Sequence, residues 1–427
     1  MTRSPSNCHH PITHHQSHYQ PLNDSKIIND PVFGFIKIPH GLLLRIVQHP
    51  LMQRLTRIKQ LGLASFVYPA AQHTRFQHSL GAFHLMSEAI TSLSQKGIYF
   101  FEPEEEGVQA AILLHDIGHG PFSHVLEHTL VNGITHEDIS LLMMQQMNNE
   151  MNGELNYTLK IFKDEYPKRF LHQLISSQLD MDRLDYLRRD SFFTGVHEGN
   201  IGSARIIKML DVVDDQLVVN SKGIYSIENF LTSRRLMYWQ VYLHKTAVAC
   251  EKVLINMLLR AKDLACNGQT IFASPALNFF LTHDVDTECF YRDEKALHYY
   301  SLLDDSDLWS AIKVWMDSDD RILSMLANNL INRNIFRVEV HETPISEERQ
   351  EQLQKEIAQK AGVSFDEARY LMNVSTIGKD MYDAGDDRIG ILYKDGTIRD
   401  IADCSEILNI GLLSKKIRKY YLCYQRF

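Results

Sequence analysis

The chain has 427 residues, of which 44% are hydrophobic and 23% are charged, a composition typical of a globular protein with roughly two or three domains. The formal net charge of −9 argues against a surface that binds nucleic acid over its whole extent. The six cysteines lack any Cys-x-x-Cys spacing, and neither a signal peptide nor an apolar run of the ~20 residues that cross a bilayer is found, so we predict a cytoplasmic protein with no membrane partner.

The first part of the chain predicts a polar tail followed by a long helical region. Residues 1–22 carry five histidines and are expected to be flexible, either chelating metal loosely or having no role. From residue 23 to 332 the apolar residues mostly follow the 3.6-residue period of helices, with a small hairpin expected near 214–223. Helices are expected at 42–61, 75–94, 107–114, 136–150, 168–190, 204–211, 227–265 and 307–332.

The pattern changes after residue 332. Residues 335–340 alternate like a strand, residues 346–361 have helical spacing, and Ser364 with Glu367 forms a capping box. A hairpin with an Asp-Gly turn is expected at 388–399 and a last strand at 417–424. The predicted fold is therefore mainly α, with a helical domain at 23–332 and a smaller C-terminal α+β module at 333–427.

The segment from His115 to His124 contains a His-Asp pair, two further histidines, two glycines and a proline. Val108, Ala111, Ile112 and His115 share one helical face, so the imidazole of His115 is expected on the buried side of a helix end. A buried imidazole beside a carboxylate is costly unless both are paired or bind a cation. We therefore predict a metal site at His115 and Asp116, the alternative being a core histidine hydrogen-bonded to its neighbour.

Two other segments offer matching ligands. His78 shares a helical face with Ala82 and Leu85, and Asp182 shares one with Leu179 and other apolar residues. Two imidazoles and two carboxylates suit Mn, Fe, Co, Ni or Zn, and leave two positions of an octahedral ion for water or substrate. For Asp182 the alternative is an exposed salt bridge to Arg183 or Arg189.

In this order, the motifs resemble the HD phosphohydrolase superfamily, and more closely the deoxynucleoside triphosphate triphosphohydrolases of the sterile-alpha-motif-and-HD type. We expect no sterile-alpha-motif module, because too few residues precede the HD region. The matching segments are Asn29–Pro31, Gln53–Gly62, Tyr68–Pro69, Arg75–Gly81, His115–His124, Thr135–Glu137, Asp180–Asp182 and Tyr242–Lys245.

The resemblance implies a role for individual positions. Catalytic histidines would be drawn from His119, His124 and His136, with Glu137 orienting His136, and Lys26 with Asn29 would match an activating-nucleotide site. Guanine-gated activation is not expected, because Gln48 and Thr56 replace the aspartate and arginine that would read the base. Implied substrate contacts are Arg75, Arg183, Arg189 and Arg234 for the phosphates, Gln60 and Leu61 for the sugar, and Tyr186, Asp190 and Tyr242. Arg183, Tyr238 and Glu127 replace a lysine, a histidine and an aspartate of the family.

These expectations describe a metal-dependent phosphohydrolase. One divalent transition metal, with Mg possible on the substrate phosphates, would activate water for attack on the α-phosphorus of a dNTP, releasing deoxynucleoside and triphosphate. A homodimer or homotetramer is implied by the resemblance. Two alternatives remain: an HD hydrolase of another phosphate ester (a nucleoside monophosphate, a cyclic nucleotide or an alarmone), or a nucleotide-sensing module without turnover.

Overall fold

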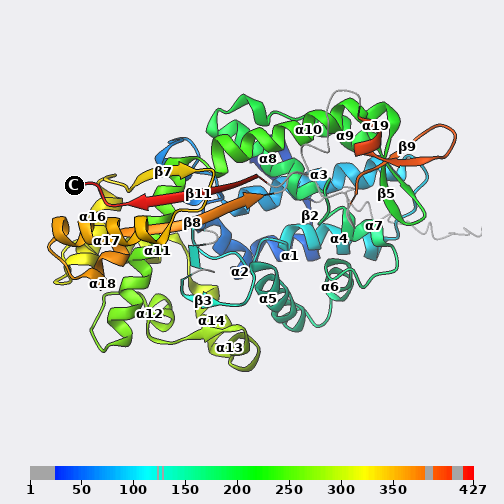
Figure 1. The fold of residues 1–427 in the computed structure, drawn as a ribbon. Coiled ribbons are helices and arrows are strands. Elements are labelled where there is room, and N and C mark those ends of the chain that lie inside the picture. The colour runs from blue at the N-terminus through cyan, green and yellow to red at the C-terminus, as the bar shows by residue number, and fades with distance from the viewer. Residues whose placement is uncertain (1–24, 123–124, 127–128, 380–387, 406–416) are drawn as a thin grey trace, which may run out of the picture.

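The computed structural model describes residues 25–122, 125–126, 129–379, 388–405 and 417–427. The predicted tail at 1–22 and His124 lie outside these residues. The fold is mainly helical, with short strands grouped into small sheets (Figure 1), and this confirms the predicted fold class. The division at residue 332 stays a prediction.

The helices, in chain order, are α1 (Leu42–Gln48), α2 (Pro50–Arg54), α3 (Arg75–Ser94), α4 (Glu102–Leu114), α5 (His136–Glu150), α6 (Asn156–Phe162), α7 (Arg169–Gln173), α8 (Met181–Thr194), α9 (Ser203–Met209), α10 (Ile224–Met237), α11 (Lys245–Cys266), α12 (Pro275–Thr282), α13 (Thr287–Arg292), α14 (Glu294–Leu302), α15 (Asp305–Trp315), α16 (Arg321–Ile331), α17 (Glu347–Ala361), α18 (Phe365–Ala368) and α19 (Ile401–Cys404). The strands are β1 (Ser25–Asp30), β2 (Gly34–Pro39), β3 (Val131–Asn132), β4 (Leu210–Val213), β5 (Gln216–Asn220), β6 (Val285–Asp286), β7 (Arg337–His341), β8 (Met372–Lys379), β9 (Gly390–Leu392), β10 (Ile398–Asp400) and β11 (Ile417–Tyr424).

Several long predicted helices are divided in the structure. The helix expected at 42–61 breaks at Pro50, which starts α2, and the one expected at 168–190 is interrupted before Asp180, which caps α8. The segment 227–265 contains a π-helical turn, Tyr238–Tyr242, between α10 and α11. The helix expected to start near Gly107 begins earlier, at Glu102, because Glu102, Glu104 and Glu105 in its first turn favour the positive end of the α4 dipole.

The helix α3 is the central element for the site, and it packs against α4 and α8. Its start is fixed by a capping box in which Thr74 and Gln77 bond each other's backbone. Gly81 lies where α8 crosses most closely, since a Cβ there would stand 1.9 Å from Asp185 Oδ1 and 2.1 Å from Arg189 Nη2. A side chain at this position would separate the two helices.

The last part of the chain contributes to two sheets at opposite ends of the molecule (Figure 1). β11 lies between β7 and β8, antiparallel to both, whereas β9 pairs in parallel with β5 and extends the sheet to β10-β9-β5-β4. The predicted hairpin near 214–223 is formed by β4 and β5, whose turn residues Asp214 and Asp215 both have positive φ. The strands β9 and β10, from the predicted C-terminal module, thus extend a sheet whose other two strands, β4 and β5, lie in the predicted helical domain.

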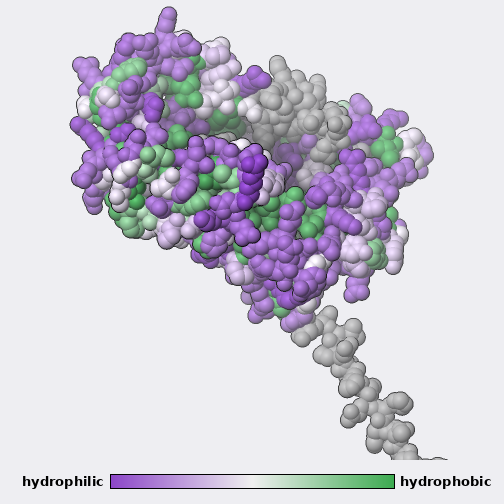
Figure 2. Space-filling model, turned by 90° about the horizontal axis from the view of Figure 1, so that it is seen from below, coloured by the Kyte–Doolittle hydropathy of each residue, from purple (hydrophilic) through white to green (hydrophobic). Residues whose placement is uncertain are grey.

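The surface is mixed in character. On the face shown in Figure 2, hydrophilic residues predominate and hydrophobic residues form small separate areas. Among the described residues, no helix has both the length and the apolar content to cross a membrane.

Candidate metal centre

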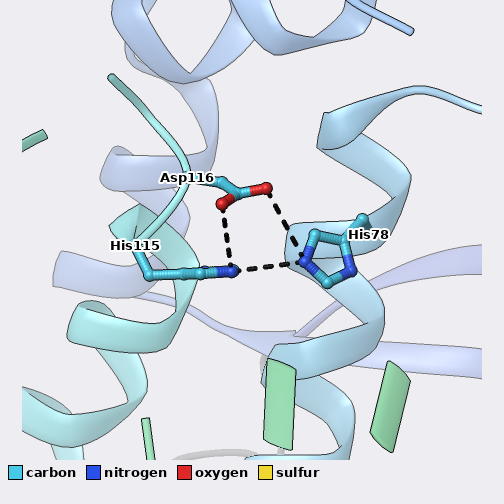
Figure 3. A group of neighbouring side chains, drawn as sticks. All are labelled: His78, His115 and Asp116. Atoms are coloured by element: carbon cyan, nitrogen blue, oxygen red, sulfur yellow. Dashed lines mark hydrogen bonds and ion pairs between the residues drawn. The ribbon is translucent and has the colours of Figure 1, made fainter. Parts of the chain in front are cut away.

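Four side chains from three segments converge on one point. His78 comes from the first half of α3, His115 and Asp116 follow the end of α4, and Asp182 lies in the first turn of α8. Figure 3 shows how the first three face one another. The Nε2 atoms of His78 and His115 are 3.2 Å apart, and Asp182 Oδ1 is 3.0 Å and 3.5 Å from them, respectively.

The Asp116 carboxylate closes the group. Its Oδ1 lies 3.4 Å from His115 Nε2 and its Oδ2 lies 3.7 Å from His78 Nε2. Two ligands about 2.1 Å from an octahedral ion, at right angles to each other, are about 3 Å apart. The spacing of these nitrogen and oxygen atoms therefore fits neighbouring ligands of one cation.

The second nitrogen of each imidazole is already engaged. His78 Nδ1 is 2.6 Å from Asp185 Oδ2, and His115 Nδ1 is 2.7 Å from the carbonyl oxygen of Ile112. Both partners accept hydrogen bonds, so both Nδ1 atoms carry the proton and both Nε2 lone pairs point at the same space. Two lone pairs and two carboxylates facing one point form the donor set of a divalent metal.

The electrostatics of the cluster favour positive charge at its centre. Burial alone lowers the pKa of the His78 imidazole, but Asp182 and Asp185 outweigh burial and raise it to about 10. The pKa of His115 is also raised, because Asp116 and Asp182 outweigh burial. The pKa of Asp116 is lowered despite burial, mainly by His115 and Arg75, and that of Asp182 is lowered by His115 and His78. Protons on the imidazoles and a divalent cation are alternative ways to balance the same carboxylates.

A buried ion network supports His78 from behind. The carboxylate of Asp185 accepts a hydrogen bond from His78 Nδ1 and another from Arg189 Nε, which lies 2.9 Å from Asp185 Oδ2. The Nη1 atom of Arg189 donates to Asp30 Oδ2 at 2.7 Å, at the end of β1. Arg189, which we expected to hold phosphate, is fully buried and instead fixes the carboxylate that orients His78.

The turn after Asp116 brings the expected catalytic histidines close. The rings of His119 and His136 stack with their centroids 3.8 Å apart, and His119 Nε2 is 3.4 Å from Asp116 Oδ1. Burial, followed by the positive charge of Arg75, holds the pKa of His119 well below its usual value. Glu137 lies exposed in the first turn of α5. His119 is therefore a neutral imidazole between Asp116 and His136.

The residues expected to bind substrate lie in two places, one beside the metal cluster and one around Asp190. Arg75 joins the metal cluster, where its Nη1 bonds Asp116 Oδ2, and Arg183 bonds Asp180. Asp190 is buried, and its carboxylate accepts from Tyr242 Oη at 2.6 Å and contacts His73 Nε2 at 2.8 Å. The ring centroid of Tyr186 is 6.1 Å from that of Tyr242, and Arg234 donates a hydrogen bond to Gln178. Gln60 and Leu61 are half-buried, and the backbone nitrogen of Gln60 donates to the carbonyl oxygen of His73.

The two residues expected at an activating-nucleotide site, Lys26 and Asn29, are exposed on β1.

Asp185 and His73 are functional candidates that sequence reasoning missed. Asp185 is one helical turn from Asp182 and one turn before Arg189, a spacing that places an acid and a base on the same face as a ligand. A histidine that binds a metal through one ring nitrogen needs a hydrogen-bond acceptor for the other. The spacing of Asp182, Asp185 and Arg189 is therefore the sequence signal that could have identified Asp185 as this acceptor. For His73, in the segment before α3, no comparable signal exists, because its partner Asp190 lies far away in the sequence on α8.

Asp305, at the start of α15, accepts from the backbone nitrogens of Lys59 and Phe122 at 3.0 Å and 3.3 Å. Burial raises its pKa to about 6. The folded state therefore keeps a proton on Asp305 between the unfolded pKa of about 3.9 and about 6, and in that window stability falls as pH rises.

We expect the free energy of unfolding of the wild type, relative to Asp305→Asn, to fall by up to about 3 kcal/mol from pH 4 to pH 7. Urea unfolding of both proteins in EDTA at several pH values measures this difference. Curves that remain parallel across the range would show that Asp305 does not bind the proton.

Comparison with known proteins agrees with this geometry. Residues 75–189 match the HD domain family, and residues 201–410 match the HD-associated region. A phosphohydrolase from Bacteroides thetaiotaomicron VPI-5482 is 66% identical, with a TM-score of 0.92 over 94% of this chain and 100% of that chain. The fold and the His78–His115–Asp116 cluster are together those of an HD-domain protein. The chain belongs to the HD-domain phosphohydrolase family.

Two curated relatives extend the comparison. The Bacillus subtilis protein YwfO, described as uncharacterized, is 31% identical over 95% of this chain and 93% of its own length. The deoxynucleoside triphosphate triphosphohydrolase SAMHD1 homolog of Dictyostelium discoideum is 30% identical over 57% of this chain. The match spans only 51% of the Dictyostelium protein, about half its length.

Proposed function

We propose that this protein hydrolyses dNTPs to deoxynucleoside and triphosphate, with one divalent metal held by His78, His115, Asp116 and Asp182. The observation that carries the proposal is the pair of Nε2 atoms 3.2 Å apart, each with its Nδ1 already bonded. The metal would supply a Lewis acid for a phosphoryl oxygen and lower the pKa of a bound water. The dNTP substrate is suggested by the resemblance to triphosphohydrolases, including the Dictyostelium relative.

The protein's own residues would position the substrate and move the proton. Arg75, beside Asp116, would offset phosphate charge near the metal, and Arg183, in the first turn of α8, would do the same. Asp190, held between His73 and Tyr242, would accept from a sugar hydroxyl. His136, stacked on His119 and half-buried, would protonate the departing 5′-oxygen.

Replacing His136 with glutamine is expected to lower turnover by about 10²–10⁴-fold and to leave metal binding unchanged, because the imidazole contributes proton transfer rather than a ligand. Steady-state kinetics and metal analysis of the same preparation measure both quantities. His84→Gln, at a partly exposed histidine of α3 outside the cluster, is the matched control for the change from histidine to glutamine. An unchanged rate in His136→Gln would assign the proton transfer elsewhere.

The substrate is tested by incubating the protein with each dNTP and rNTP and several divalent metals, and resolving the products by chromatography. We expect deoxynucleoside and intact triphosphate. Release of orthophosphate or pyrophosphate would favour the other HD hydrolases, and binding without turnover would favour a sensing module. We further propose a homodimer or homotetramer, which light scattering in the presence and absence of nucleotide tests.

A further inference from the structure

The turn that carries Asp116 and His119 is held in place by a distant part of the chain. Tyr300, in α14, donates a hydrogen bond from its Oη to the carbonyl oxygen of Gly118 at 3.0 Å. Asp305 accepts from the backbone nitrogen of Phe122 at the other end of the turn. We call residues Tyr300–Asp305 the α14–α15 corner, and it contacts the turn at both ends.

Arg54 joins this corner to the turn through the core. Its side chain is buried, with Nε 2.7 Å from the carbonyl oxygen of Leu303 and Nη1 3.2 Å from that of Ile117. Leu303 is the C-cap residue directly after α14, so a cation here also lies at the negative end of a helix dipole. Burial lowers the pKa of Arg54 to about 10, which leaves the guanidinium charged at neutral pH.

The opposite side of the turn is fixed by α5. Ser140 Oγ donates to the carbonyl oxygen of His115 at 2.8 Å and accepts from Gly118 N at 2.9 Å. A Cβ on Gly118 would stand 2.2 Å from the carbonyl oxygen of His136, so the turn and α5 are in direct contact. Phe122 has a φ of 56°, an unfavourable value for an aromatic residue. The turn therefore depends on its surroundings for its shape.

We propose that Arg54 and the α14–α15 corner are positioning residues for the metal centre. By fixing the carbonyl oxygens of Ile117 and Gly118, they set where the Asp116 carboxylate and the His119 ring lie. The turn belongs to the part matching the HD domain and the corner to the part matching the HD-associated region. The associated region thereby controls metal affinity in the HD domain. This inference rests on the proposed metal site and not on the proposed substrate.

Tyr300→Phe tests the inference, because it removes one hydrogen bond to the turn and little volume. Tyr166→Phe is the matched control, since Tyr166 Oη donates to Glu104 Oε1 at 2.9 Å near the start of α4, and the change again removes one hydrogen bond and little volume. Isothermal titration with Mn²⁺ gives the dissociation constant, and thermal unfolding in EDTA gives the cost in stability. We expect both variants to lose similar stability, and only Tyr300→Phe to bind Mn²⁺ about 10-fold more weakly.

Arg54→Lys provides a second variant, which keeps the charge but lacks the planar guanidinium that holds the two carbonyl oxygens in fixed directions, and the same weakening is expected. Equal Mn²⁺ affinities in wild type, Tyr300→Phe and Arg54→Lys would overturn the inference. A wild type that binds Mn²⁺ without hydrolysing any dNTP would reject the proposed substrate alone, and the affinities would still decide the role of the corner. A wild type that binds no Mn²⁺, Fe²⁺, Co²⁺, Ni²⁺ or Zn²⁺ would reject both proposals.

Discussion

Replacing His115 with alanine is expected to remove the bound metal and to lower turnover by about 10³-fold or more, corresponding to a loss of about 4 kcal/mol of transition-state stabilisation. His115 supplies one of the two Nε2 atoms at the centre of the cluster, and its Nδ1 is held by the carbonyl oxygen of Ile112. The same outcome is expected for Asp182→Ala, whose side chain is partly exposed and contributes little to the core. Metal content after purification and steady-state turnover are the two measurements.

The control for this prediction is His84→Ala. His84 lies further along α3 from His78, partly exposed and 3.5 Å from Glu88, so its loss should leave metal and turnover unchanged. Circular dichroism of all variants establishes that they remain folded. Normal metal content in both His115→Ala and Asp182→Ala would contradict the ligand assignment.

The second large effect is on stability. Replacing Arg189 with methionine is expected to destabilise the protein by about 3–5 kcal/mol, because it removes the only side chain that bonds both Asp185 and Asp30 among the described residues and leaves two carboxylates buried without it. His78 would also lose the fixed orientation of its Nδ1 partner, so metal affinity should fall as well. Urea unfolding in EDTA separates the loss of stability from the loss of metal.

Arg188→Met is the neighbouring control. Arg188 is half-buried and donates to the carbonyl oxygen of Val32 and to Ser203 Oγ, both at 3.2 Å, and neither partner is charged. Its replacement should cost about 1 kcal/mol or less. If Arg189→Met and Arg188→Met lost similar free energies of unfolding, the Asp30–Arg189–Asp185 network would contribute no more to stability than the ordinary hydrogen bonds of Arg188.

The features that could be predicted from the sequence are those encoded locally. The helix at 75–94 and the one at 136–150 were placed with the correct bounds, since each has a Thr cap and an uninterrupted apolar period. The strand at 417–424 and the helix ending at Ala361 follow similar local signals. The His-Asp pair was informative because a buried imidazole beside a carboxylate requires compensation.

Features that depend on contacts between distant segments could not be predicted. The pairing of β9 with β5 joins residues about 170 positions apart, and no local pattern encodes which strand a hairpin joins. Arg189 was expected to hold phosphate because its charge alone is visible in the sequence, whereas its burial depends on β1 meeting α8. The contact between Asp190 and His73 likewise depends on α8 meeting the segment before α3.

Anomalous diffraction from crystals soaked in Mn²⁺ tests most directly whether four side chains bind one cation. We predict a single strong peak within about 2.1–2.3 Å of His78 Nε2, His115 Nε2 and one oxygen each of Asp116 and Asp182. No peak at this point in fully soaked crystals, or a peak bound by other residues, would contradict the account.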